Sequence, residues 1–201
     1  MPALTEGAYQ GDWLIEEFGA PNYGRSEVNV LAPVDVPSGA VIGTCTTLTT
    51  FYGAYDNVGT ANTGKAAAAA GILLDEVKAN AAMDCSIVDA ADVGTGTTTE
   101  AHCLVVGDII EVKGATDANL NVYATIASVP TPMTFTIATS VVADATYAVT
   151  IRKLNHAAVA LVKGPAVVSA AGLDWDATAA AGITTGTAEL LALNIKTVEG
   201  V

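Results

Sequence analysis

The segment Met133-Thr134-Phe135-Thr136-Ile137 alternates large apolar residues with threonines. Successive side chains of an extended chain point to opposite faces, so the three apolar residues would share one face and the threonines the other. Residues 108–113 and 147–151 repeat this alternation. The pattern predicts half-buried antiparallel strands and a mainly β fold, of the β-rich α+β class, in which short helices are minor elements.

The alternation is most regular over residues 92–153, which open with the polar run Gly94-Thr95-Gly96-Thr97-Thr98-Thr99. We predict that residues 92–153 form an inserted all-β module. Insertions are tolerated where they avoid the core, so the module is expected to be a surface projection. The flanking residues 27–91 and 154–201 would then form one compact core domain.

Within the core, Pro37-Ser38-Gly39 predicts a turn between two strands. The alanine-rich stretch 66–77 fits either a strand or a helix once it is buried. The other predicted elements are strands at 26–30, 40–45 and 157–162 and short helices at 167–173 and 187–193.

Residues 1–26 are predicted to form an extended arm, because five glycines and prolines between Gly7 and Gly24 interrupt every candidate helix. Disordered tails usually lack aromatic residues, whereas this segment carries Tyr9, Trp13 and Phe18. The combination favours a segment that becomes ordered on a partner. The alternative is that the arm packs on its own domain.

The composition limits the classes of function that suit the chain. Of the 201 residues, 51% are hydrophobic and 14% charged, which suits one or two compact domains. A formal net charge of −13 argues against binding nucleic acid, which needs clustered lysines and arginines. The N-terminus lacks the pattern of a secretory signal, so use without export is expected. The longest apolar run, residues 66–74, is too short to cross a bilayer, and no membrane partner is expected.

No motif for chemistry is complete. Residues 59–66 match GxxxxGK, but Ala66 replaces the serine or threonine that would hold magnesium. His102 adjoins Cys103, yet neighbouring residues on a strand face opposite ways, and the three cysteines are too widely spaced for a metal or disulfide framework. Paired carboxylates at 16–17, 75–76 and 174–176 are expected on the solvated surface. We therefore expect no enzymatic activity, cofactor or metal.

The order of several segments resembles lambda-type bacteriophage head decoration proteins. The resemblance rests on the opening Thr5-Glu6-Gly7-Ala8-Tyr9-Gln10-Gly11-Asp12-Trp13-Leu14, on residues 25–30 and 37–43, on Ala70-Gly71-Ile72-Leu73, and on residues 162–168 followed by Leu173-Asp174-Trp175. Together these pieces fall within residues 1–91 and 154–201. The block 92–153 is absent from smaller family members, although parts of it resemble a small β-module of phage head and tail proteins.

The resemblance implies a homotrimer that binds the major capsid protein at local threefold positions, outside the virion shell, after synthesis in the host cytoplasm. The arm would make the capsid contact through Leu4, Thr5, Gly7, Tyr9, Trp13 and Phe18. Strand addition by such an arm gains main-chain hydrogen bonds, and a trimer multiplies a modest contact. Another phage structural role, as a tail tube, spike or adhesion module, is the alternative, and an enzyme acting through carboxylates comes third.

Overall fold

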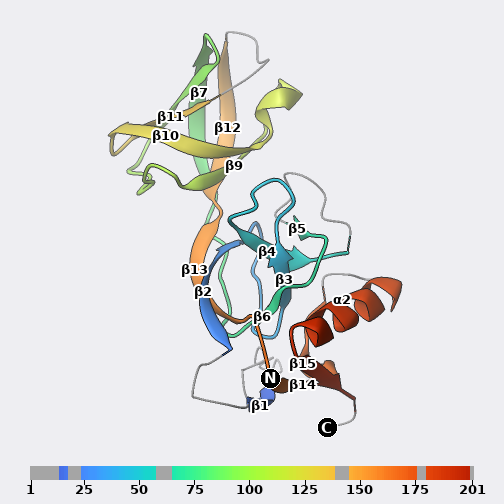
Figure 1. Ribbon diagram of the computed structural model, residues 1–201. Coiled ribbons are helices and arrows are strands. Elements are labelled where there is room, and N and C mark those ends of the chain that lie inside the picture. The colour runs from blue at the N-terminus through green and yellow to red at the C-terminus, as the bar shows by residue number, and fades with distance from the viewer. Residues whose placement is uncertain (1–13, 18–23, 58–64, 139–144, 176–179, 200–201) are drawn as a thin grey trace, which may run out of the picture. The chain divides into compact units, whose positions relative to one another are not determined.

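The computed structural model describes residues 14–17, 24–57, 65–138, 145–175 and 180–199 (Figure 1). The chain divides into two compact units. Residues 1–79 and 156–201 make up the first, called here the core unit, and residues 80–155 make up the second, the barrel unit. Strands dominate both units, which confirms the prediction of a mainly β fold.

The barrel unit is a closed antiparallel barrel of six strands, with the neighbour order β10-β11-β8-β7-β12-β9 (Figure 1). Its strands are β7 (Met83–Ala90), β8 (Val93–Thr98), β9 (Ile109–Lys113), β10 (Tyr123–Thr131), β11 (Thr134–Ala138) and β12 (Thr146–Lys153). A short 3₁₀ helix, Ala118–Leu120, precedes β10. Alternate residues of β7, β8, β11 and β12 are buried, as expected for strands with one face toward a core.

The barrel begins earlier than the boundary expected at residue 92. β7 pairs with β8 along one edge and with β12 along the other, so the ring cannot close without it. The unit therefore spans 80–155 where the sequence pattern suggested 92–153. Nothing in the local sequence of β7 specifies which strands it will pair with.

The hairpin between β7 and β8 turns through Ala91 and Asp92, which both have positive φ, 52° and 63°. Ala90 and Val93 pair across it, so the loop has two residues, the arrangement for which Asn-Gly is preferred. A left-handed conformation costs a residue with a β-carbon about 1–2 kcal/mol.

We expect the double change Ala91→Asn with Asp92→Gly to raise the unfolding free energy of the barrel unit by about 1 kcal/mol, because both residues then suit the turn. Urea unfolding of the full chain measures the effect. Ala148→Asn, on the exposed face of β12, is the control and should not stabilise the unit. An unchanged or lower urea midpoint for the double variant would contradict the expectation.

The core unit contains a six-stranded sheet of order β2-β13-β6-β3-β4-β5, in which an added β2–β4 pairing curls the sheet on itself. Val30 and Ile42 are fully buried between its strands, beside Leu73 and Ala160. The strands are β2 (Arg25–Leu31), β3 (Val41–Thr44), β4 (Tyr52–Tyr55), β5 (Lys65–Ala66), β6 (Gly71–Leu73) and β13 (Asn155–Leu161).

The alanine-rich stretch is extended and contributes β5 and β6. Its form follows from close packing, because a β-carbon added at Gly71 would lie 2.7 Å from the Leu161 carbonyl oxygen of β13. Ala66 and Ile72 are fully buried. Of the two forms left open for residues 66–77, the helix is not adopted; strand is limited to Ala66 and Gly71–Leu73, with bends at 67–68 and 74–75.

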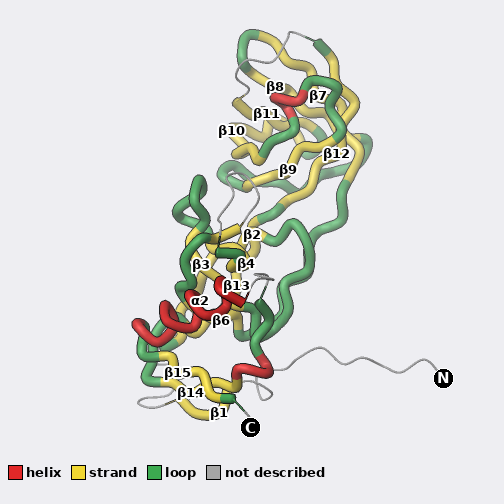
Figure 2. The backbone as a smooth tube through the Cα atoms, turned by 90° about the vertical axis from the view of Figure 1, so that its right-hand side faces the viewer, coloured by secondary structure: helices red, strands yellow, loops and turns green. Residues whose placement is uncertain are grey.

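A second sheet of the core unit has the order β1-β14-β15, formed by Leu14–Glu17, Ala166–Ser169 and Ile195–Val198 (Figure 2). The short helix predicted at 167–173 is wrong over most of its length. β14 pairs in parallel with β15 through Ala166 to Ser169, and only Ala170–Gly172 form a 3₁₀ turn. The β-branched Val167 and Val168 fit this strand.

The helix predicted at 187–193 is present but begins earlier, as α2 (Ala180–Ala192). Its buried residues Gly182, Gly186 and Leu190 recur every fourth position and form one face. Tyr55 packs there, donating its hydroxyl proton to the Gly182 carbonyl oxygen at 2.9 Å and meeting Trp175 edge to face. No helix in the described part of the chain is long and apolar enough to cross a membrane.

Candidate functional site

The six residues expected to contact a capsid lie outside the described residues, namely Leu4, Thr5, Gly7, Tyr9, Trp13 and Phe18. Two parts of the arm are described: β1, which pairs antiparallel with β14, and residues 24–26, of which Arg25 and Ser26 begin β2. Leu14 stands opposite Val168 and is packed against the buried cluster that includes Val168 and Leu190. This segment of the arm thus pairs with a strand of its own unit, and Leu14 packs on that unit.

β1 is an edge strand. Its pairing with β14 uses one side, and among the described residues no strand pairs with the other (Figure 2). The register shifts between Leu14 and Glu16, so the strand is bulged. An open edge of backbone N–H and C=O groups is the surface to which a strand of another protein can be added.

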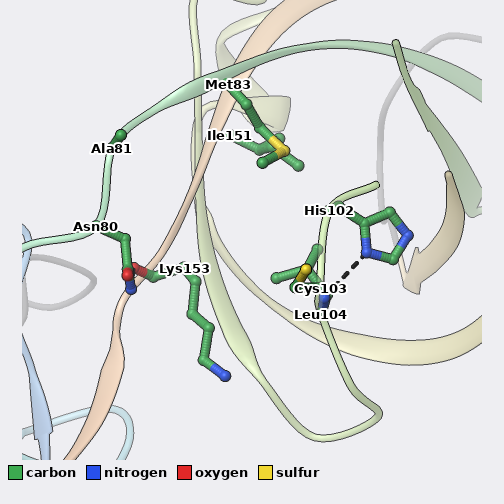
Figure 3. Close-up of a pocket in the computed structure, with 8 residues that line it drawn as sticks. All are labelled: Asn80, Ala81, Met83, His102, Cys103, Leu104, Ile151 and Lys153. Carbon is green, nitrogen blue, oxygen red and sulfur yellow. Dashed lines mark hydrogen bonds between the residues drawn. The ribbon is translucent and has the colours of Figure 1, made fainter. Parts of the chain in front are cut away.

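The barrel unit holds a pocket of about 200 Å³ (Figure 3). Met83, Leu104 and Ile151 give it an apolar lining, and Lys153 lies at one side. The full lining is Asn80, Ala81, Met83, His102, Cys103, Leu104, Ile151 and Lys153. Asn80 donates a side-chain hydrogen bond to the Lys153 carbonyl oxygen at 3.0 Å, which ties the first residue of the unit to its last strand.

Beside the pocket, Lys153 forms an ion pair of 2.8 Å with Asp108, which is only 3% exposed. The other Asp108 oxygen accepts from the Val105 N–H at 2.9 Å, and the Asn155 amide donates to the Lys153-bound oxygen. Burial by itself raises the pKa of Asp108, but the hydrogen bonds from Lys153, Val105 and Asn155 outweigh it and lower that pKa. Asp108 is therefore held as a carboxylate.

His102 is buried, and its Nδ1 accepts the Leu104 N–H at 3.0 Å (Figure 3). An accepting Nδ1 carries no proton, so the neutral ring has its proton on Nε2. The ring lies edge to face with Phe135, 5.5 Å between centroids. His102 is thus a core residue that shapes the loop before β9.

Cys103 is exposed while its neighbour His102 is buried, so the two face opposite ways, but in a loop and not on a strand. Cys103 has a φ of 53°, in the left-handed region of the backbone. Cys45 and Cys85 are buried, and burial raises the pKa of each thiol to about 11. Within the described residues no group of three or more His, Cys, Asp or Glu side chains could hold a metal ion.

The GxxxxGK stretch is mostly outside the described residues, but its end, Lys65–Ala66, is the strand β5. A phosphate-binding loop of this type leads into a helix, so the described end does not have that form. The exposed carboxylates Asp75, Glu76 and Asp174 lie on the surface, as expected. The sequence interpretation overlooked the buried Asp108, whose partner Asn155 is 47 residues away.

No family model, curated protein or solved structure matches this chain.

Proposed function

We propose that this chain is a bacteriophage head decoration protein that binds the outside of an icosahedral capsid and stabilises the shell. The resemblance of segments within residues 1–91 and 154–201 to lambda-type decoration proteins is one support. The observation that carries the proposal is β1: in the sequence, the segment that holds the aromatic residues Tyr9 and Trp13 leads directly into an edge strand of the core unit whose outer side pairs with no described strand.

An edge strand that bulky aromatic residues precede in the sequence suits binding by strand addition. Main-chain hydrogen bonds along the edge supply affinity, and pockets for alternate side chains supply specificity. Interfaces concentrate their energy in a few aromatic anchors, and the arm offers Trp13 and Phe18 as such anchors. A trimer at a local threefold position would then engage three arms at once, so a modest contact per copy gives a stable cap.

Electron microscopy of the purified chain mixed with undecorated capsids of its virus tests the proposal. Density at local threefold positions is expected for the full chain and should be lost when residues 1–13 are removed. Density away from every symmetry axis, or no density with the full chain, would overturn it.

Single tryptophan changes test the arm, because the chain has only two tryptophans. Trp13→Ala should weaken capsid binding at least about tenfold, the loss of one anchor of roughly 2 kcal/mol, and leave the melting temperature unchanged. Trp175→Ala is the matched control: Trp175 packs on Tyr55, so its loss should lower the melting temperature. Unfolding by Trp13→Ala with capsid affinity intact would refute the docking role.

A tail, spike or adhesion role is the second candidate, favoured by the barrel unit, a compact β module inserted between β6 and β13. Such a module would keep its ligand when the arm is removed. A decoration protein would instead lose its binding to the capsid when the arm is removed.

A further inference from the structure

The pocket of the barrel unit has a sulfur-bearing side chain on each of two sides. Figure 3 shows the Met83 and Ile151 side chains on one side of the pocket and the Cys103 and Leu104 side chains on the other. Ile151 and Leu104 are buried, whereas Cys103 and Ala81 are exposed, so the pocket opens to solvent beside the last two residues. A ligand that enters there would lie between a thioether and a thiol.

The volume of the pocket limits what can enter it. An apolar cavity of about 150 Å³ holds a benzene molecule, so a pocket of about 200 Å³ admits one six-membered ring with a small substituent. Sites for drug-sized molecules usually measure roughly 300 Å³ or more. The ligand is therefore a single ring or an alkyl chain of similar size.

The two sulfur atoms favour the aromatic ring over the alkyl chain. Sulfur makes favourable contacts with the edges of aromatic rings, and the flexible methionine side chain adapts to the shape of what it contacts. An alkyl chain gains nothing from sulfur that leucine or isoleucine would not supply equally. With Met83 on one side and Cys103 on the other, the pocket offers such contacts from both sides.

The charged groups beside the pocket favour a neutral ligand with an acceptor oxygen. Lys153 is the one charged residue of the lining, and its ammonium lies 2.8 Å from the Asp108 carboxylate. Asp108 would repel an anion that reached this ammonium, and Lys153 would repel a cation. A neutral oxygen can accept a hydrogen bond from the ammonium without either cost. A hydroxyl group on the ring has this property.

We infer that the barrel-unit pocket binds one neutral phenol ring, held between the Met83 and Cys103 sides with its oxygen toward Lys153. A phenol combines the aromatic ring, the small size and the neutral acceptor that the pocket favours. All lining residues belong to the barrel unit, so the inference does not rest on capsid binding by the arm.

Nuclear magnetic resonance of the full chain with labelled methionine methyl groups tests the inference, with para-cresol, the side chain of tyrosine, as the probe. The chain has three methionines, so three signals are expected. The Met83 signal should shift saturably, with a dissociation constant of about 1 mM or lower for so small a ligand. Met133 is 41% exposed and does not line the pocket, so its signal should stay unchanged.

Related probes and a matched pair of variants test the chemistry. The saturated analogue of para-cresol should bind about threefold more weakly, because it lacks the contacts of sulfur with an aromatic ring. The anion para-toluate should bind at least about tenfold more weakly, because Asp108 repels it. Met83→Leu keeps the volume but removes the sulfur, so it should weaken para-cresol about threefold and leave the saturated analogue unchanged. Met133→Leu should change neither, and melting curves show that both variants are folded.

The amide of N-acetyltyrosine distinguishes two sources of the phenol. Binding as tight as that of para-cresol would assign the pocket to a tyrosine side chain of a partner protein, and loss of binding would assign it to a free phenol. No saturable shift of the Met83 signal, equal affinity for the saturated analogue, or tighter binding of para-toluate would overturn the inference. Capsid microscopy decides the proposed function independently of all these results.

Discussion

Phe135→Ala should lower the unfolding free energy of the barrel unit by about 3–5 kcal/mol, the range for removing a fully buried aromatic side chain. Phe135 is 0% exposed and belongs to the central cluster of the barrel. Its ring covers Gly96 on the neighbouring β8, where an added β-carbon would lie 2.1 Å from the ring. Because Gly96 has no side chain to fill the space, the variant would leave a cavity.

Calorimetry of the full chain measures this effect as a shift in the transition of the barrel unit. Met133→Ala is the control, because Met133 is 41% exposed just before the same strand, and its loss should change stability by less than about 0.5 kcal/mol. The transition of the core unit should keep its temperature in both variants. Equal shifts for Phe135→Ala and Met133→Ala would show that Phe135 does not hold the barrel together.

Strand β11, which contains Phe135, shows how much the local alternation of residues predicts. Alternation placed Phe135 and Ile137 on one face, and both are fully buried. It placed Met133 on that face too, but β11 begins at Thr134, so Met133 lies in the turn before it and is exposed. An alternation with a period of two predicts which face of the sheet each residue of a strand lies on. It says little about where the strand begins or ends.

The local sequence pattern does not predict which strands pair with each other. β7 belongs to the barrel because it pairs with β12, more than fifty residues later, and no glycine or proline marks its turn at Ala91 and Asp92. Val167 and Val168 were expected in a helix and form a strand because β15 lies alongside them. Tertiary pairing overrides weak local preference in both cases.

The candidate sites differ in what the sequence could reveal. The arm was found from its glycines and aromatic residues, which are local signals, and its capsid contact stays a prediction. The pocket and the Asp108 network join residues from distant segments, so no spacing pattern indicated them. The only sequence signal for this network was that Asp108 is a polar residue at the start of a predicted strand. An ordinary exposed strand end has the same signal.

Asp108→Asn should lower the unfolding free energy of the barrel unit at neutral pH by about 2 kcal/mol, since it removes the charged partner of a buried hydrogen-bond network. The same change should flatten the acid dependence of stability. The folded state lowers the pKa of Asp108 below its ordinary value of 3.8, so the unfolded chain binds more protons near that pH. Stability from this carboxylate is fully present above about pH 4 and is lost as pH falls through the lowered pKa.

Melting temperatures of wild type and Asp108→Asn between pH 7 and pH 2 measure both effects, with the gap between the two proteins narrowing below pH 4. Asp35→Asn is the matched control. The Ala79 N–H and Lys78 also lower the pKa of Asp35, but that carboxylate is exposed on the core unit, where water screens the pair. Its removal should therefore leave the barrel transition unchanged at every pH. A gap for Asp108→Asn that stays constant down to pH 2 would mean that the Lys153 pair does not stabilise the folded barrel through its charge, and that Asp108 acts only as a neutral hydrogen-bond acceptor for the Val105 turn.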